Sequence, residues 1–142
     1  MKCVASGFLG LALAAVVASA AVAADACFDK TGDAAIAACT RQINSGEVKG
    51  SGLAGLYNAR AIEYRQKGIY DKAIADYTEA MKRDRTRTGT YTGRGLAYEG
   101  KGELDKAKGD YKKALTVPPK YDDGKWAHDV ARDRLKALAD KK

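Results

Sequence analysis

The sequence has little of what enzyme active sites are usually built from. Its 142 residues include a single histidine, His128, so there is no second histidine for a metal site. There is also no recognisable Ser/His/Asp arrangement and no glycine motif of the kind that binds phosphate. His128 lies among charged residues of a predicted helix, and we interpret it as a solvated surface side chain. We therefore expect a non-catalytic protein with no catalytic residue, no metal site and no cofactor, and we rank an enzyme subunit behind two binding hypotheses.

Long apolar runs are absent beyond the first 24 residues. The run 4–24 follows a lysine, contains no acidic residue and ends in a small-x-small cleavage pattern at Ala21–Ala23. This predicts a secretory signal peptide over residues 1–23, cleaved at the end of that pattern, with Ala20 and Ala24 as alternative sites. The run is also long enough to span a bilayer, so an uncleaved N-terminal membrane anchor is the alternative. We expect an exported chain, periplasmic or secreted, with no membrane span after signal removal.

The charge balance of the chain is basic. Its 25 Lys and Arg residues outnumber 18 Asp and Glu residues, which gives a net charge of +7, and removal of Lys2 with the predicted signal lowers it by one. A basic balance is typical of nucleic-acid-binding proteins, but the predicted export makes nucleic acid an unexpected partner. Anionic envelope polymers, lipid head groups or an acidic protein suit an exported chain better, and a merely well-solvated surface is the preferred explanation.

Cysteine is scarce as well. Cys3 falls within the predicted signal peptide, which leaves Cys27 and Cys39 in a compartment where disulfides persist. With only two cysteines the pairing is forced if they are oxidised, and closing a loop of about a dozen residues is worth about 3 kcal/mol in a chain-entropy description. A redox-active dithiol usually has two residues between its cysteines at a helix start, which this pair does not. A structural disulfide is therefore favoured over free or reactive thiols.

The chain does contain an internal repeat with a period of 34 residues. Residues 57–85 align with residues 91–119 at about a dozen identical positions, far more than the roughly two expected by chance. The repeated residues include Tyr57, Arg60, Tyr64, Gly68, Asp71, Lys72, Ala73, Asp76, Tyr77 and Ala80, which recur as Tyr91, Arg94, Tyr98, Gly102, Asp105, Lys106, Ala107, Asp110, Tyr111 and Ala114. A period of this length is typical of stacked helical hairpins.

Each repeat unit predicts two amphipathic helices joined by a short turn. In the first unit the helices are expected at residues 56–67 and 72–83, where apolar residues recur at helical spacing. Gly68 is expected to end the first helix and Asp71 to cap the second, and the second unit copies this turn at residues 102–105. Helices joined by so short a turn must be antiparallel neighbours.

An arginine and an aspartate recur at the same positions in both units. Arg60 and Arg94 belong to the first helix of each hairpin, and Asp76 and Asp110 belong to the second. We interpret each as a cross-hairpin ion pair, in preference to a charged functional row. Such a pair contributes little to stability if it is exposed.

The two units resemble the tetratricopeptide repeat, whose pattern runs W-x2-L-G-x2-Y, then A-x3-F, then a later Ala and Pro. The matching residues are Tyr57, Arg60, Ala61, Tyr64, Ala73, Tyr77 and Ala80, and then Tyr91, Arg94, Gly95, Tyr98, Ala107, Tyr111, Ala114 and Pro119. Small residues at positions 61 and 95 let two helix backbones approach closely. Arginine replaces the usual Leu in both units, and Arg85 stands where Pro is expected, which predicts a looser turn between the repeats. The resemblance implies an all-α fold, a short right-handed solenoid of antiparallel helix pairs that presents a surface to partners.

The segment before the repeats carries a shorter version of the same pattern. An apolar stripe from Ala35 to Ile43 matches the second helix of a repeat, and the leading helix is reduced to a short segment around Cys27. This predicts a degenerate N-terminal half repeat in which a disulfide from Cys27 to Cys39 replaces lost packing. A flexible, glycine-rich connector is expected at residues 45–52.

The segment after the repeats predicts one C-terminal capping helix, at residues 122–139, begun by Asp122 or Asp123. Trp126 is expected to be an anchor packed on the second repeat, and a ligand platform is the alternative. The predicted organisation is a signal peptide at 1–23, a half repeat and connector at 24–52, full repeats at 53–87 and 88–121, and a capping helix at 122–142.

The resemblance also implies where a partner binds, because the first helix of each hairpin lines the ligand groove in this family. By position, the groove residues are Asn58, Ile62, Arg65, Gln66, Thr92, Leu96 and Glu99. Ile62 and Leu96 stand where the members that clamp a terminal carboxylate carry asparagine, so capture of a chaperone tail is disfavoured. A mixed apolar and polar groove suits a peptide or a partner helix.

A basic cluster on the turn between the repeats gives the second binding hypothesis. It consists of Lys82, Arg83, Arg85 and Arg87, and a solvated connector at a helix C-terminus accounts for it equally well. The leading hypothesis is an exported, non-catalytic adaptor or scaffold that binds an unidentified protein or peptide. The alternative is a non-catalytic binder of an anionic envelope polymer or lipid head group through this turn.

Overall fold

The computed structural model describes residues 27–140, and the predicted signal peptide at residues 1–23 lies outside them. Within the described residues the chain is all-α, as the sequence predicts, and contains no strand. Its helices are α2 (Gly32–Ser45), α3 (Gly50–Gln66), α4 (Tyr70–Arg83), α5 (Thr88–Gly100), α6 (Leu104–Thr116) and α7 (Gly124–Ala139). None of these helices is long and apolar enough to cross a membrane.

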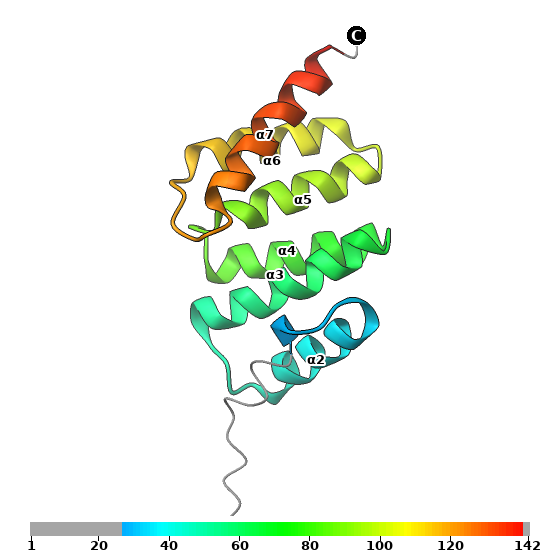
Figure 1. Ribbon diagram of the computed structural model, residues 1–142, viewed down its shortest axis with the longest axis vertical. Helices are drawn as coiled ribbons and strands as arrows, with labels where there is room; N and C mark the ends of the chain where they lie inside the picture. Colours follow the sequence, from blue (N-terminus) through cyan, green and yellow to red (C-terminus); the bar gives the residue numbers. More distant parts are fainter. Residues whose placement is uncertain (1–26, 141–142) are drawn as a thin grey trace, which may run out of the picture.

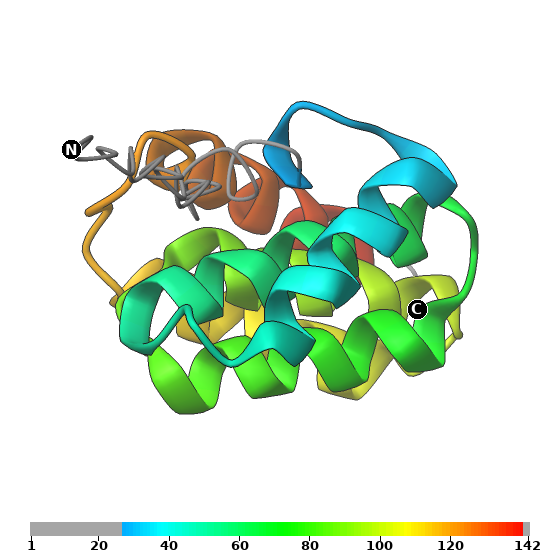
Figure 2. The ribbon, with the colours of Figure 1, turned by 90° about the horizontal axis from the view of Figure 1, so that it is seen from below.

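The helices stack as a solenoid of antiparallel pairs (Figure 1). Helix α3 packs against α4, and α5 packs against α6, while contacts between α4 and α5 join the two hairpins. At one end of the stack α2 packs on α3, and at the other end α7 packs on both α5 and α6. Viewed from the α2 end (Figure 2), the second hairpin, α5 with α6, lies behind α2, α3 and α4. The two hairpins are therefore covered at both ends of the stack.

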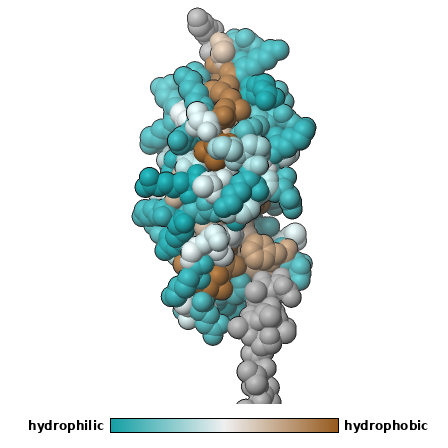
Figure 3. All heavy atoms as spheres, turned by 90° about the vertical axis from the view of Figure 1, so that its left-hand side faces the viewer, coloured by the Kyte–Doolittle hydropathy of each residue, from teal (hydrophilic) through white to brown (hydrophobic). Residues whose placement is uncertain are grey.

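The outer surface of the stack is mostly hydrophilic. On the face shown in Figure 3, apolar side chains form only a narrow, interrupted band along the length of the molecule, with hydrophilic side chains on both sides. A solenoid of only two hairpins needs covered ends and hydrophilic outer faces, because each repeat otherwise leaves apolar surface open to water.

Glycine ends the first helix of each hairpin, as predicted. Gly68 and Gly102 adopt φ values of 72° and 80°, a left-handed conformation that glycine takes without steric cost. The amide of the next residue, Ile69 or Glu103, then donates to a carbonyl five residues earlier. The cap prediction for Asp71 was wrong by two residues, because Ile69 occupies the N-cap and Asp71 lies in the first turn of α4. In that turn its charge still interacts favourably with the helix dipole.

Helix α3 begins earlier than its sequence pattern indicates. It starts at Gly50, so the flexible connector expected at residues 45–52 is reduced to the stretch 46–49. Glycines at the start of α3 disfavour a helix by about 1 kcal/mol each relative to alanine. The reason for the early start is packing, since Ala54 and Leu56 on these first turns are buried, Leu56 in one core cluster with Cys39 of α2.

The predicted disulfide joins Cys27 and Cys39, whose Cα atoms are 4.8 Å apart. Both cysteines are buried in the cluster that joins α2 to α3. Helix α2 takes the place of a second helix, as predicted, because Thr40 on α2 and Thr78 on α4 play the same part. Each hydroxyl accepts a hydrogen bond from the arginine of the following helix, Arg60 or Arg94.

The two repeated arginines each connect three consecutive helices. Arg94 of α5 makes two hydrogen bonds of 2.8 Å to the carboxylate of Asp110 on α6, and its third nitrogen lies 3.0 Å from Thr78 of α4. Arg60 repeats this arrangement with Asp76 at 2.7 and 2.8 Å. The predicted cross-hairpin pairs are thus confirmed. They are largely buried, since the Arg94 and Asp110 side chains are 20% and 9% exposed, so the loss of one partner should cost more than it does in a surface pair.

Small residues allow the close approach of helices that the repeat pattern predicts. A Cβ atom at Gly95 of α5 would lie 2.6 Å from the ring of Tyr111 on α6, and one at Gly93 would lie 2.6 Å from the ring of Tyr77 on α4. Both tyrosines are fully buried. The glycines thus make room for the aromatic rings that fill the space between neighbouring helices.

The capping helix α7 forms as predicted but does not use Trp126 as its anchor. Trp126 is 50% exposed, whereas Ala127, Ala131 and Leu138 are buried. Ala127 and Ala131 lie four residues apart on one helical face, and these small side chains let α7 approach α5 and α6 closely. The neighbouring tryptophan consequently points away from the stack, and the anchor prediction was wrong.

His128 is not the solvated side chain that the sequence indicates. It is half-buried, and its Nε2 atom lies 3.1 Å from the carbonyl oxygen of Ala114 and 2.9 Å from that of Val117. Because both partners are carbonyl oxygens, Nε2 carries the donating hydrogen. His128 thus ties α7 to the last turn of α6, where carbonyl groups have no partner within the helix.

Candidate partner-binding site

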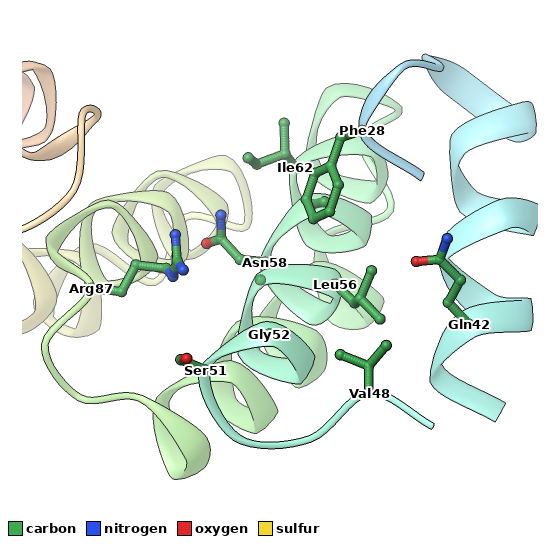
Figure 4. Close-up of a pocket in the computed structure, with 11 residues that line it drawn as sticks. Phe28, Gln42, Val48, Ser51, Gly52, Leu56, Asn58, Ile62 and Arg87 are labelled. Atoms are coloured by element: carbon green, nitrogen blue, oxygen red, sulfur yellow. The ribbon is translucent and has the colours of Figure 1, made fainter. Parts of the chain in front are cut away.

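The structure contains a hollow between α2, the first half of α3 and the start of α5 (Figure 4). We call it the α2–α3 hollow, and its volume is about 430 Å³. Its lining residues are mostly apolar or small and come from four separate segments of the chain: Phe28, Gln42, Val48, Ser51, Gly52, Gly55, Leu56, Asn58, Ala59, Ile62 and Arg87. This volume is of the order expected for a site that takes a few side chains of a ligand.

Phe28 forms one wall of the α2–α3 hollow. Its side chain is 59% exposed, although Cys27 beside it is buried and held by the disulfide. A Cβ atom at Gly55 of α3 would lie 3.8 Å from the Phe28 ring and 3.9 Å from the guanidinium of Arg87. Gly55 therefore forms a floor between an exposed aromatic ring and a cation.

Gln42 supplies an unusual polar group to this apolar hollow. The residue is only 6% exposed, and neither its amide nitrogen nor its amide oxygen has a hydrogen-bond partner among the described residues. Figure 4 shows the amide directed from α2 toward the hollow. A buried amide without partners costs about 1–3 kcal/mol, so such groups are rare in native structures unless a ligand or water satisfies them.

The side-chain oxygen of Asn58 is bonded within the protein. The residue is nearly buried, and its Oδ1 atom accepts a hydrogen bond of 3.0 Å from the Thr90 hydroxyl of α5. This bond ties α3 to α5 at the edge of the hollow. Asn58 therefore shapes the wall more than it offers a free acceptor.

Arg87 stands at the N-terminal end of α5 and is held by an aromatic ring. Its guanidinium carbon lies 4.0 Å from the ring centroid of Tyr121, on the loop before α7. Among the described residues it makes no ion pair. The Tyr121 hydroxyl in turn donates to Asp84. Arg87 is thus a positioned cation that makes no direct ion pair, although the nearby Asp84 carboxylate interacts with it electrostatically.

Asp84 fixes the position of Tyr121, the ring on which Arg87 stacks. Burial alone would raise the pKa of its carboxyl, but hydrogen bonds donated by Thr86 and Tyr121 outweigh burial and lower the pKa below its usual range. The carboxylate therefore stays charged at neutral pH and keeps Tyr121 in place under Arg87.

The predicted groove residues do not form one continuous site. Asn58 and Ile62 line the α2–α3 hollow, whereas Arg65, Leu96 and Glu99 line a separate hollow of about 330 Å³ together with Arg134 of α7. Gln66 is exposed and lines neither hollow. The sequence pattern could not reveal this division, because it depends on where α7 packs.

Helix α7 covers the groove over the second repeat. Thr92 is fully buried, and its hydroxyl donates to the carbonyl oxygen of Ala127 on α7. Glu99 accepts hydrogen bonds from the Tyr111 hydroxyl and from Arg134 of α7. Burial and the neighbouring Glu99 carboxylate raise the pKa of Tyr111, so it remains a neutral donor. Helix α7 thus closes part of the groove over the second repeat, and the larger of the two hollows lies at the α2 end.

The basic cluster between the repeats is also divided. Lys82 and Arg83 both pair with Glu79 at 2.6 Å, and these bonds lower the pKa of the Glu79 carboxyl. Arg85 lines a different hollow together with Lys82 and Lys113. Only Arg87 reaches the α2–α3 hollow. Lys82 and Arg85 thus share one hollow, whereas Arg87 lines another, so the cluster is divided between two places on the surface.

Gln42 is the lining residue on α2, and the 34-residue period does not predict its place in the hollow because α2 follows a different register. The stretch Ala35-Ile36-Ala37 recurs as Ala73-Ile74-Ala75, and Thr40 recurs as Thr78, at a shift of 38 residues that differs from the main period. This signal places α2 as a second helix in full register. It would have directed attention to Gln42, which lies one half-turn beyond Thr40 on α2.

Known proteins support the same architecture. The family model of the tetratricopeptide repeat (TPR) matches residues 54–87 and 88–121. The second TPR domain of human RPAP3, solved by NMR with the HSP70 peptide SGPTIEEVD, is similar over 87% of this chain and 100% of that one, with a TM-score of 0.68 and 24% identity. The Arabidopsis OM64 TPR domain is similar over 71% of this chain and 80% of that one, with a TM-score of 0.57 and 26% identity.

The first TPR domain of human RPAP3 is similar over 78% of this chain and 84% of that one, with a TM-score of 0.57 and 23% identity. No curated protein sequence is significantly similar to the chain. The matched repeats are the same two hairpins that the 34-residue period defines, α3 with α4 and α5 with α6. With the repeat signature and the fold in agreement, residues 54–121 are two tetratricopeptide repeats within the fold of a TPR domain.

Proposed function

We propose that this protein is an exported, non-catalytic adaptor that binds a segment of a partner protein in the α2–α3 hollow. TPR domains are protein–protein interaction modules, and this is the larger of the two hollows that the expected groove residues line. The observation that carries the proposal is the combination of an exposed Phe28 ring, an unsatisfied Gln42 amide and the Arg87 cation around one apolar hollow. The buried Gln42 amide is unfavourable in the free protein, and the exposed ring and the cation beside it offer further contacts to a ligand that covers all three.

The geometry favours a protein segment over a small metabolite. The hollow adjoins a smaller one of about 200 Å³ that shares Phe28, Ala59 and Ile62 with it. The two hollows therefore lie next to each other beside α3, and an extended peptide or one helical face can contact both.

Photocrosslinking in the cells that produce the protein tests this proposal. A photoreactive residue at Ile62 is expected to capture a defined partner, because this side chain lines both hollows. The matched control is a photoreactive residue at Lys112, an exposed position on α6 outside either hollow. The proposal fails if Ile62 captures no protein, or only what Lys112 captures.

Export is the second part of the proposal, and it rests on the apolar run and cleavage pattern of residues 1–23. Mass spectrometry of the mature protein from the extracytoplasmic fraction is expected to find a chain that starts at Ala24. A protein that retains its N-terminus in the membrane fraction would instead support the anchor, and a full-length chain in the cytoplasm would refute export.

A further inference from the structure

The α2–α3 hollow has features that select among protein segments, so the chemistry of the partner can be narrowed if the proposed function holds. We propose that the hollow recognises an internal acidic segment of the partner. One bulky apolar side chain of that segment packs between Phe28 and Ile62, and a nearby Asp or Glu carboxylate pairs with Arg87.

Charge complementarity is the evidence that the bound segment contains an acidic residue. The lining of the hollow contains Arg87 and no aspartate or glutamate. Stacking on Tyr121 holds the guanidinium in place, and its five N–H donors match a carboxylate in two-point geometry. The net charge of +7 on the whole chain adds a long-range attraction for acidic segments.

The walls of the hollow are the evidence that the bound segment also contains a bulky apolar side chain. Phe28 is an exposed aromatic ring, and Val48, Leu56 and Ile62 complete a surface that water solvates poorly. One aliphatic or aromatic side chain fills such a space and displaces its water. Buried apolar anchors of this kind usually provide most of the affinity in peptide recognition.

Gln42 completes the site as a recognition group for the peptide backbone. A primary amide offers one acceptor and two donor hydrogens, so it can pair with both the N–H and the C=O of a ligand residue. The Gln42 amide has neither partner in the free protein and faces the hollow. A bound segment therefore satisfies a group that is otherwise left without hydrogen bonds.

An internal segment suits the site better than a chain end. Phe28 and Ile62 also line the smaller hollow, which includes Lys30, Ala35 and Glu63, so a bound chain that passes these two residues can run on in that direction. A free terminal carboxylate is usually held by several cations or backbone amides, and Arg87 is the only cation in the lining of the α2–α3 hollow.

A peptide array tests the inference on the mature protein with its disulfide intact. The probes are N-acetylated, C-amidated twelve-residue Gly/Ser peptides that carry one Leu, Phe or Met and one Asp or Glu, one to three residues apart. Matched peptides carry Asn or Gln instead of the acid, and a further set has a free C-terminus and no acidic side chain. We expect the acidic peptides to bind about fivefold more tightly than their amide counterparts.

Variants on the same turn locate the source of this preference. The preference should disappear in Arg87→Gln and persist in Arg85→Gln, which changes an exposed arginine two residues away. Arg87→Lys keeps the charge and should keep part of the preference, and circular dichroism checks that each variant is folded. The inference would be overturned if Arg87→Lys lost the preference for acidic peptides as fully as Arg87→Gln does, or if the parent protein showed no such preference.

Gln42→Met provides an independent readout. Because this substitution removes an unsatisfied buried amide, it should raise the melting temperature of the protein. It should also weaken the binding of every peptide that carries an apolar and an acidic residue, by about the same factor. A stabilised variant with unchanged binding would refute the role of Gln42.

The two proposals fail in distinguishable ways. The inference of an acidic internal segment would be overturned by any of three results. These are tight binding of the peptides with a free C-terminus and no acidic side chain, binding of apolar peptides without a preference for an acidic residue, and no binding of any peptide in the array. None of these results bears on whether Ile62 captures a partner in cells, which decides the proposed function separately.

Discussion

Breaking the pair between Arg94 and Asp110 should destabilise the protein far more than breaking an exposed ion pair. Asp110→Ala removes two hydrogen bonds of 2.8 Å and leaves a guanidinium that is only 20% exposed without its carboxylate. Exposed pairs contribute about 0–1 kcal/mol, and loss of one partner from a fully buried pair costs about 3–5 kcal/mol. The residual exposure of Arg94 lets water reach it in part, so we expect a loss of about 2–3 kcal/mol.

A double-mutant cycle isolates the interaction itself. The free energy of unfolding is measured by urea denaturation at pH 7 for Arg94→Ala, Asp110→Ala and the double variant, with circular dichroism as the signal. The expected coupling energy is about 2 kcal/mol. The control cycle uses Lys82 and Glu79, whose side chains are 64% and 35% exposed, and should give less than about 0.5 kcal/mol. Equal coupling in both cycles would refute the assignment of a stabilising role to the repeated arginine.

Three further predictions address packing, the disulfide and acid stability. Gly95→Ala should lower the free energy of unfolding by about 1–3 kcal/mol, because a Cβ there meets the Tyr111 ring at 2.6 Å. The control Gly109→Ala should not lower it, because no atom lies within 4 Å of a Cβ at that position. Equal urea midpoints for the two variants would contradict this prediction. The Cys27→Ala/Cys39→Ala variant should lose about 3 kcal/mol and also bind peptides more weakly, since Phe28 is no longer held at the hollow; unchanged affinity would show that the disulfide does not position that wall. Asp84 has a lowered pKa in the folded state, so its contribution is present above the unfolded pKa of about 3.9 and is lost as the pH falls through the folded pKa. Asp84→Asn should therefore lose less stability than the parent protein between pH 5 and pH 3 in urea titrations, and identical losses would remove Asp84 from the acid transition.

The parts of the fold that the sequence predicts well are the local and repeated ones. The hairpin turns depend on a glycine at positions 68 and 102, and the ion pairs recur at fixed positions within each unit. Cys27 and Cys39 could pair only with each other once Cys3 is set aside. These features involve residues close in the chain or copied at a constant period, so a single sequence contains enough information to locate them.

The features that the sequence does not predict depend on the packing of the end helices. Trp126 is exposed and Thr92 is buried because small alanines bring α7 onto α5, and no local pattern encodes that choice. Likewise, Gly50 joins a helix only because α2 packs on the first turns of α3. The candidate site was consequently half predicted, with Ile62 and Arg87 assigned to separate hypotheses that the structure places at one hollow.

The most direct measurement of the central claim is an NMR titration of the ¹⁵N-labelled mature protein with the tightest-binding peptide of the array. If the α2–α3 hollow is the binding site, the largest chemical-shift changes should fall on the backbone amides of Phe28, Gly55, Ile62 and Arg87. The amides of Lys112 and Leu115 on α6 should not move. Largest changes on α6, or equal changes over the whole protein, would contradict the account.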